Sequence, residues 1–185
     1  SPDIPEYSAV TFTSTGRSYT MRKILPLSHR PRAYPGPDGD FWVSEGRGTY
    51  VLRRERVTGD TVLIIERVFE PVAVSAEARQ VAEEELEPGE GMASEDNAAS
   101  RLPSVHPPFE DFFAATDSTL WVRRVAGDRQ GFDVFDGDGR YLGVANAPFD
   151  AVDLQMRYIT GDHMYAVIED DLGVQSLVVL RIVRG

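Results

Sequence analysis

The sequence contains no cysteine, only one lysine and no long apolar run. The absence of cysteine excludes thiol catalysis, disulfide bonds and cysteine-ligated zinc. Because no stretch of about 18 or more apolar residues occurs, the sequence predicts no membrane-spanning helix. Thirty acidic residues against 19 basic ones give a net charge of −11. This balance argues against nucleic acid or an anionic membrane surface as a partner.

Short apolar or alternating runs, separated by turns rich in Gly and Asp, are typical of an antiparallel β protein. The 185 residues suffice for a domain with a sizeable core. The predicted strands are 9–13, 18–24, 40–44, 49–54, 61–67, 109–115, 119–124, 131–135, 140–145, 155–160, 163–168 and 175–183. Tight-turn signals such as Asp38-Gly39 and Gly161-Asp162 lie between them, because Gly and Asp tolerate the backbone conformations of short hairpins.

One segment interrupts the strand pattern. Residues 75–87 are rich in Ala and Glu and predict a short helix with Ser75 as its N-cap. Residues 74–112 hold ten acids opposed only by Arg79 and Arg101, and so carry eight of the eleven net negative charges. Two interpretations remain open for this insert: a solvated, partly disordered loop, or a mobile lid.

An internal repeat is the most informative feature of the sequence. Residues 38–43 (DGDFWV) match residues 117–122 (DSTLWV) and, more weakly, residues 161–166 (GDHMYA). Trp42 and Trp121 are 79 residues apart, Trp121 and Tyr165 are 44 apart, and the insert accounts for the difference. Four antiparallel strands recurring every 40–50 residues or so predict β-propeller blades, which stack because one small sheet cannot bury both of its faces.

The repeat predicts an all-β fold of about three four-stranded antiparallel blades, part of a larger propeller, with one short helix and an acidic loop between blades. The whole chain, 1–185, is then one partial propeller domain. Its parts are an outer hairpin of a preceding blade (9–24), a blade (32–68), the helical and acidic insert (69–108), a blade (109–145) and a nearly complete terminal blade (155–183). Three blades are too few to close a ring, so the open blade edges predict self-association.

Several motifs resemble those of a known family. Residues 120–124 (LWVRR), 132–136 (FDVFD) and 139–143 (GRYLG) resemble bacterial six-bladed β-propellers of the NHL-like or TolB-like superfamily, as do residues 161–167 (GDHMYAV) and 170–174 (DDLGV). The resemblance covers most of the chain outside the insert and places it in the C-terminal half of such a protein. It implies a periplasmic or extracellular location, with a leader upstream of Ser1, and implies no particular activity.

Propeller geometry divides the loops between two faces. The short Asp/Gly turns share the bottom face, whereas the long irregular loops share the top face, where binding groups gather near the axis. Arginines on these top loops or inner strands are the candidates for an anion-binding rim, and one acid of the 169–171 run offers a carboxylate beside the axis. The predicted ligand-binding residues are Arg32, Arg47, Arg124, Arg129, Arg157 and Asp170.

Other chemistry-bearing residues favour structural roles. Asp133, Asp136 and Asp138 are spaced like the oxygen ligands of a calcium loop, but the bidentate acid expected further along is missing, which favours a plain hairpin turn. Trp42 and Trp121 occupy equivalent blade positions and are expected to pack between blades.

No metal or cofactor site is predicted from this chain alone. His29, His106 and His163 share no metal-ligand spacing. An axial calcium or zinc ion would need ligands from blades outside this chain. The sequence also has no Gly-x-Ser-x-Gly elbow, P-loop or His-Glu-x-x-His motif.

Two function classes follow. The first is a non-catalytic ligand-binding or protein-interaction module whose top face near the axis binds a peptide, a glycan or a small molecule. The second is a propeller enzyme, of the lyase or lactonase/hydrolase type, with an axial metal ion whose ligands lie partly outside this chain. The missing catalytic motifs favour the first class.

Overall fold

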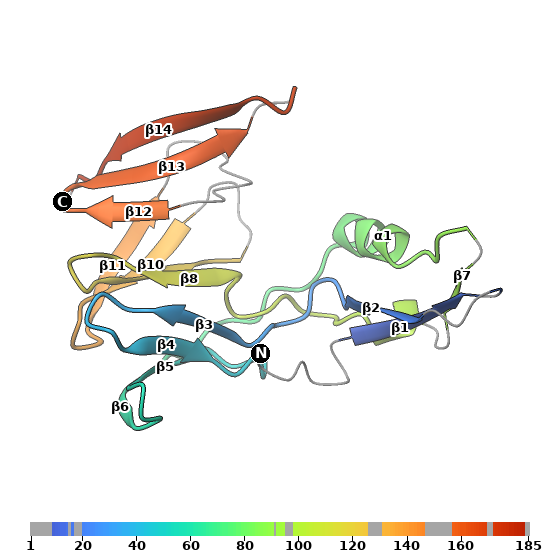
Figure 1. The fold of residues 1–185 in the computed structure, drawn as a ribbon, viewed down its shortest axis with the longest axis horizontal. Helices are drawn as coiled ribbons and strands as arrows, with labels where there is room; N and C mark the ends of the chain where they lie inside the picture. The colour runs from blue at the N-terminus through green and yellow to red at the C-terminus, as the bar shows by residue number, and fades with distance from the viewer. Residues whose placement is uncertain are drawn as a thin grey trace. The chain divides into compact units, whose positions relative to one another are not determined.

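The computed structural model describes residues 9–14, 16, 20–90, 92–94, 98–125, 131–146, 157–169 and 172–183. The described residues form antiparallel sheets and a single α-helix, which confirms the predicted all-β class with four-stranded sheets and one short helix (Figure 1). The chain divides into two compact units. Unit 1 comprises Ser1–Arg32, Ser44–Tyr50 and Arg67–Pro108, and unit 2 comprises Ala33–Val43, Val51–Glu66 and Phe109–Gly185.

Unit 1 is built around a three-stranded sheet with the strand order β2-β1-β7. These strands are β1 (Ala9–Ser14), β2 (Thr20–Ile24) and β7 (Met92–Ser94). The hairpin β1–β2 was predicted as part of a preceding blade, but β1 pairs on its other side with β7, which belongs to the insert. The insert and the hairpin therefore form one sheet.

The predicted helix is present in unit 1 as α1 (Ala76–Glu85). Ser75 is its N-cap, and the Ser75 side chain accepts a hydrogen bond of 3.0 Å from the Ala78 N–H. Lys23 donates to the carbonyl oxygen of Glu85 at 3.2 Å, at the end of the helix where a cation is favoured.

The insert also supplies much of the unit 1 core. The buried cluster joins the hairpin to α1 and to the 3-10 helix η2 (Ala98–Arg101), and it consists of Val10, Phe12, Leu25, Ala82, Leu86, Ala98 and Leu102. Ala82 and Leu86 lie four residues apart on one side of an otherwise polar, acidic segment. That short apolar stripe packs the described part of the insert against the hairpin, although its composition alone favoured a solvated loop.

Unit 2 contains three antiparallel sheets. Two terminal strand residues of the first sheet, Arg32 and Ser44, belong to unit 1. The first sheet has the order β3 (Arg32–Pro35), β4 (Phe41–Ser44), β5 (Val51–Glu55) and β6 (Thr61–Glu66). The second has the order β8 (Asp111–Ala114), β9 (Leu120–Arg123), β10 (Gly131–Phe135) and β11 (Tyr141–Asn146). The third has three strands, β12 (Arg157–Thr160), β13 (His163–Glu169) and β14 (Gln175–Arg181).

The β3–β4 hairpin of the first sheet and the β8–β9 hairpin of the second sheet have the same hydrogen-bond pattern in their turns. In the β3–β4 turn the Gly39 N–H donates to the Gly36 carbonyl at 3.2 Å, and in the β8–β9 turn the Ser118 N–H donates to the Ala115 carbonyl at 3.1 Å. Both donors have left-handed backbones, with φ of 81° at Gly39 and 64° at Ser118. A positive φ is unusual for serine, so the turn geometry is preserved even where glycine has been replaced.

The second hairpins repeat in the same way. The Gly59 N–H donates to the Arg56 carbonyl at 2.8 Å in the β5–β6 turn, and the Gly139 N–H donates to the Asp136 carbonyl at 3.0 Å in the β10–β11 turn. A shift in strand register precedes each turn at the equivalent place. The sequence repeat therefore corresponds to a structural repeat of four-stranded sheets.

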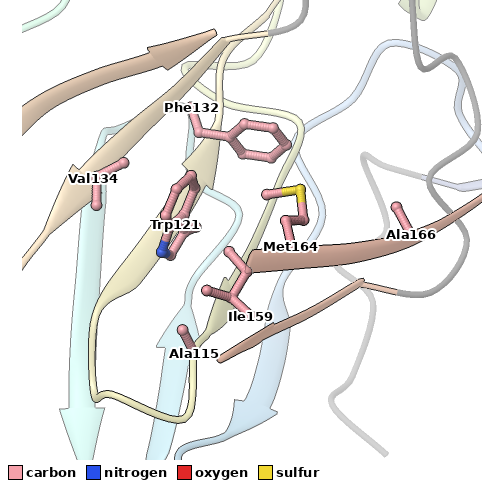
Figure 2. Close-up of a cluster of buried hydrophobic side chains, with 7 residues drawn as sticks. All are labelled: Ala115, Trp121, Phe132, Val134, Ile159, Met164 and Ala166. Carbon is pink, nitrogen blue, oxygen red and sulfur yellow. The ribbon is translucent and has the colours of Figure 1, made fainter. Parts of the chain in front are cut away.

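The second and third sheets pack face to face. The buried cluster between them contains Ala115, Trp121, Phe132 and Val134 on one side, and Ile159, Met164 and Ala166 on the other (Figure 2). The indole of Trp121 stacks on Phe113 within its own sheet and meets Phe132 edge to face. The burial of Trp121 in one cluster with Ile159 and Met164 of the third sheet confirms its predicted packing between successive sheets.

The first and second sheets are also in contact. The Tyr34 ring meets Phe112 edge to face at 5.1 Å, and the Tyr34 hydroxyl donates to Asp111 at 3.0 Å. Arg54 is held by ion pairs of 3.0 Å with Asp40 and 2.9 Å with Asp38. The Tyr34 contacts join β3 of the first sheet to β8 of the second, whereas the Arg54 ion pairs hold β5 to the β3–β4 turn within the first sheet.

No helix in the described part of the chain is long and apolar enough to cross a membrane.

Candidate functional site

Two of the predicted arginines lie in unit 1, on loops that the structure brings together. Arg32 begins β3, and Arg47 lies in the loop after β4, where its guanidinium pairs with Glu45 at 2.9 Å. The two loops are joined through His29, because its Nδ1 accepts a hydrogen bond of 3.2 Å from the Gly48 N–H. The prediction that these irregular loops share one face is consistent with this contact.

The other predicted residues do not complete a described site. Arg124 follows β9 in unit 2, and its Nε lies 4.0 Å from the buried carboxylate of Asp133. Arg157 begins β12, but its side chain lies outside the described residues, as do Arg129 and Asp170 altogether. The convergence of these residues at one rim stays a prediction.

His29 and Ser44 form a polar pair in unit 1. The His29 Nε2 lies 3.3 Å from the Ser44 hydroxyl oxygen, and Ser44 is buried. Because Nδ1 accepts the Gly48 N–H, the neutral ring carries its proton on Nε2 and donates it to Ser44. A general base would instead have to accept the serine proton, so this pair holds two loops together and is not arranged for nucleophilic catalysis.

Burial, and to a smaller extent the positive charge of Arg32, lower the pKa of His29 from 6.5 to about 4. His29 is therefore neutral near pH 7, as its acceptor role at Nδ1 requires. Another histidine, His163, lies at the start of β13, and its Nδ1 is 2.7 Å from the Asp162 carboxylate. Among the described residues, no three His, Asp or Glu side chains are grouped to hold a metal ion.

Two aspartates of the calcium-like spacing, Asp133 and Asp136, accept hydrogen bonds within the β10–β11 hairpin. The Asp136 carboxylate accepts hydrogen bonds from the backbone N–H groups of Asp138 at 3.0 Å and Arg140 at 2.8 Å. Asp133 is buried and accepts the Tyr141 hydroxyl at 3.1 Å. These bonds are those of an Asp-Gly hairpin turn, the interpretation that the sequence favoured.

A groove that the sequence did not predict lies between the second and third sheets. It consists of two adjoining hollows of about 360 Å³ and 500 Å³. The residues that line both hollows are Trp121, Val144, Ala145, Ile182 and Val183, and they define the β11–β14 groove. Its walls are mainly apolar, and it lies within unit 2.

Small residues on β11 create the groove. Gly143 pairs with Val134, and Ala145 pairs with Phe132, so both lie on the face that looks toward the third sheet. A Cβ placed on Gly143 would meet no other atom within 4 Å. The corresponding residues of β6 in the first sheet are Leu63 and Ile65, which lie beside Gly139 of the second sheet.

A chain of polar groups lines part of the groove. The Trp121 Nε1 donates to the Thr119 hydroxyl at 2.9 Å, and that hydroxyl donates to Asp117 at 2.6 Å. The Asp117 carboxylate also accepts the Thr119 N–H at 3.1 Å. These bonds hold the indole in one orientation, which gives the groove a rigid aromatic wall.

The exposed edge of β14 runs beside the groove. In the described part of the chain β14 pairs with β13 alone, whereas the equivalent strands β5 and β10 each pair on both sides. The Ile182 N–H donates to the Asp162 carbonyl at 2.7 Å, which identifies Ile182 and Asp162 as a hydrogen-bonded pair. Because such pairs alternate, the main-chain groups of Leu177, Val179 and Arg181 point to the open edge.

No family model matches this chain, and a search of curated proteins found no relative.

Proposed function

We propose that this protein is a non-catalytic protein-interaction module of the β-propeller type that binds an extended polypeptide segment along β14. The bound segment becomes the fourth strand of the third sheet, and its inward side chains enter the β11–β14 groove. The observation that carries this proposal comes from the described residues: their third sheet has three strands and an unpaired edge beside an apolar groove, whereas the two preceding sheets have four strands.

The edge of β14 supports the main-chain part of the recognition. Strand addition gives affinity through backbone hydrogen bonds, and the outward groups of Leu177, Val179 and Arg181 supply a regular series of donors and acceptors. Within the described residues no strand pairs with these outward groups of Leu177, Val179 and Arg181, and an exposed strand edge of this kind is a template for pairing.

The groove supports the side-chain part. In a bound strand alternate side chains point to the same face, so every second residue would enter the space over Gly143 and Ala145. The apolar walls favour Leu, Ile or Val at those positions. The polar groups of the lining, Asp117 and Thr119, are already bonded to each other, and Thr119 is bonded to Trp121, so they suit a wall better than a reacting group.

A peptide from the chain itself provides the probe. Residues 59–67 (GDTVLIIER) contain β6, the fourth strand of the first sheet. Val62 and Ile64 alternate with Leu63 and Ile65 along β6, so in a fourth strand of the third sheet they would point toward the second sheet and enter the groove. A fluorescently labelled copy of this peptide is titrated with the protein, and anisotropy reports binding. Saturable binding is expected, and a control peptide with Asp in place of both Val62 and Ile64 is expected not to bind. Absence of binding by the first peptide would overturn the strand-addition site.

Two protein variants test the edge and the groove separately. Val179→Pro removes an N–H that points to the open edge and leaves the β13–β14 hydrogen bonds in place. Ala145→Leu fills the space that the peptide side chains would enter. Each is expected to weaken the binding of the peptide more than about tenfold, the effect of one lost hydrogen bond or one blocked apolar contact. Unchanged affinity in both variants would contradict the proposal.

A further inference from the structure

Each sheet of unit 2 carries a row of directly paired side chains on one face. In the first and second sheets this face is directed toward the next sheet along the chain. In the second sheet this row is Phe113, Trp121 and Val134, as the pairing of β8, β9 and β10 shows. Trp121 and Val134 are buried there against the third sheet. We call this surface the forward face of a sheet.

The first sheet has the same forward face. Trp42 pairs directly with Arg54, and Trp42 is buried. The Arg54 guanidinium reaches the Gly137 carbonyl of the second sheet at 3.5 Å, which shows the direction of this row. Two consecutive sheets therefore use the forward face as an interface.

The forward face of the third sheet is exposed. Its row is Tyr158, Tyr165 and Val179, which are paired directly across β12, β13 and β14. Tyr158 is 56% exposed and Val179 is 53% exposed, and the neighbouring Leu177 is 70% exposed. In the second sheet the equivalent surface, with Trp121 at the position of Tyr165, is buried. In the third sheet this surface is an exposed apolar and aromatic face.

The opposite face of the first sheet is exposed as well. We call the side of a sheet that looks toward the preceding sheet its rear face. In the third sheet the rear face includes Met164, which packs on Trp121, and the equivalent residue of the second sheet, Leu120, is fully buried. In the first sheet the equivalent residue is Phe41, and this residue is 39% exposed, while Ile64 on β6 is 58% exposed.

We propose that a second copy of this chain binds these two faces, with the rear face of its first sheet on the forward face of the third sheet. The chain itself shows this type of contact twice, so the proposed interface continues an interface already present. In the part of the chain that the structure describes, each copy offers one exposed forward face and one exposed rear face. Two copies related by a twofold axis therefore satisfy both and form a closed ring of six sheets. This assembly goes beyond the proposed peptide site, because it uses the faces of the sheets and not the edge of β14.

Sedimentation velocity of the full chain tests the assembly. The unmodified chain is expected to form a dimer that dissociates on dilution. Tyr158→Asp on the forward face and Ile64→Asp on the rear face should each weaken dimerisation by more than about 100-fold, because an unpaired carboxylate would be buried at each of two interfaces. Val57→Asp is the matched control, since Val57 lies in the β5–β6 turn and is 79% exposed. It is expected to leave the dimer unchanged.

Mixing the two monomeric variants distinguishes this arrangement from a like-to-like dimer. The Tyr158→Asp chain keeps an intact rear face and the Ile64→Asp chain keeps an intact forward face, so a mixture has one native interface and should associate more tightly than either variant alone. Circular dichroism checks that both variants fold, which is expected because both side chains are mostly exposed.

Three results would overturn the proposal. They are a monomeric unmodified chain at all concentrations, a dimer that survives Tyr158→Asp, and open oligomers that grow with concentration. A monomer that still binds the β6 peptide would refute the assembly and leave the proposed peptide site standing, so the two ideas fail independently.

Discussion

Acidification should destabilise unit 1 through His29. Burial and the charge of Arg32 lower the pKa of this histidine from 6.5 to about 4 in the folded chain. Because the folded pKa is below the unfolded pKa, the unfolded state binds the proton more tightly. The stabilisation is therefore complete above about pH 6.5 and is lost as the pH falls from 6.5 toward 4.

The size of the effect follows from the difference in pKa. Each unit of pKa difference corresponds to about 1.4 kcal/mol. At pH 5, which is about one and a half units below the unfolded pKa of 6.5, His29 is protonated in the unfolded chain and still neutral in the folded chain. The free energy of unfolding of unit 1 should therefore fall by about 2 kcal/mol between pH 7.5 and pH 5. The structural cause is that a charged imidazolium is desolvated by burial and repelled by Arg32. A protonated Nδ1 can also no longer accept the Gly48 N–H.

Urea denaturation of the chain and of a His29→Gln variant, at both pH values, measures this contribution. Glutamine offers an acceptor and a donor but does not titrate, so the variant should lack the part of the pH dependence that is due to His29. Carboxylates and the other histidines contribute equally to both proteins and cancel in the comparison. A His29 ring proton that titrates near pH 6.5 by NMR, or equal pH dependence in both proteins, would refute the reasoning.

Two further substitutions test the packing of each unit. In unit 1, Gly46→Ala should destabilise far more than Gly48→Ala. Both glycines have positive φ, but a Cβ on Gly46 would lie 2.5 Å from the Pro31 nitrogen, whereas one on Gly48 meets no atom within 4 Å. The second change should therefore cost only about 1–2 kcal/mol in urea denaturation, and equal losses would contradict the close approach of the two loops. In unit 2, Met164→Ala should cost about 2–5 kcal/mol because Met164 is buried between two sheets, and a loss below about 1 kcal/mol would show that the sheets are not tightly packed.

The local features of the fold were predictable from the sequence. Strand positions follow from alternating apolar residues, and hairpins from Gly and Asp, since these signals depend on neighbours within a few residues. The N-cap at Ser75 is likewise a local signal. The repeat of Trp42 at Trp121 also predicted that successive sheets stack, because equivalent positions in equivalent sheets share an environment.

The candidate site was not predictable in the same way. The groove exists because no described side chain fills the space over Gly143 and Ala145. A sequence shows that these two residues are small, but it does not show that the space over them is empty. The predicted arginines were chosen from loop positions. Arg47 instead has an acidic partner two residues away, at Glu45, which a search for converging positive charge did not consider.

The amino-acid sequence by itself determined which segments are strands, where they turn and that they recur, because hydrophobic alternation and turn propensity act over short distances. The tertiary structure alone decided that the acidic insert joins the N-terminal hairpin in one core. It also decided that β14, among the described residues, pairs on one side only and runs beside a groove. Both outcomes depend on contacts between residues far apart in the chain. Such contacts are selected by the packing of whole faces, for which no single segment of the sequence carries the information.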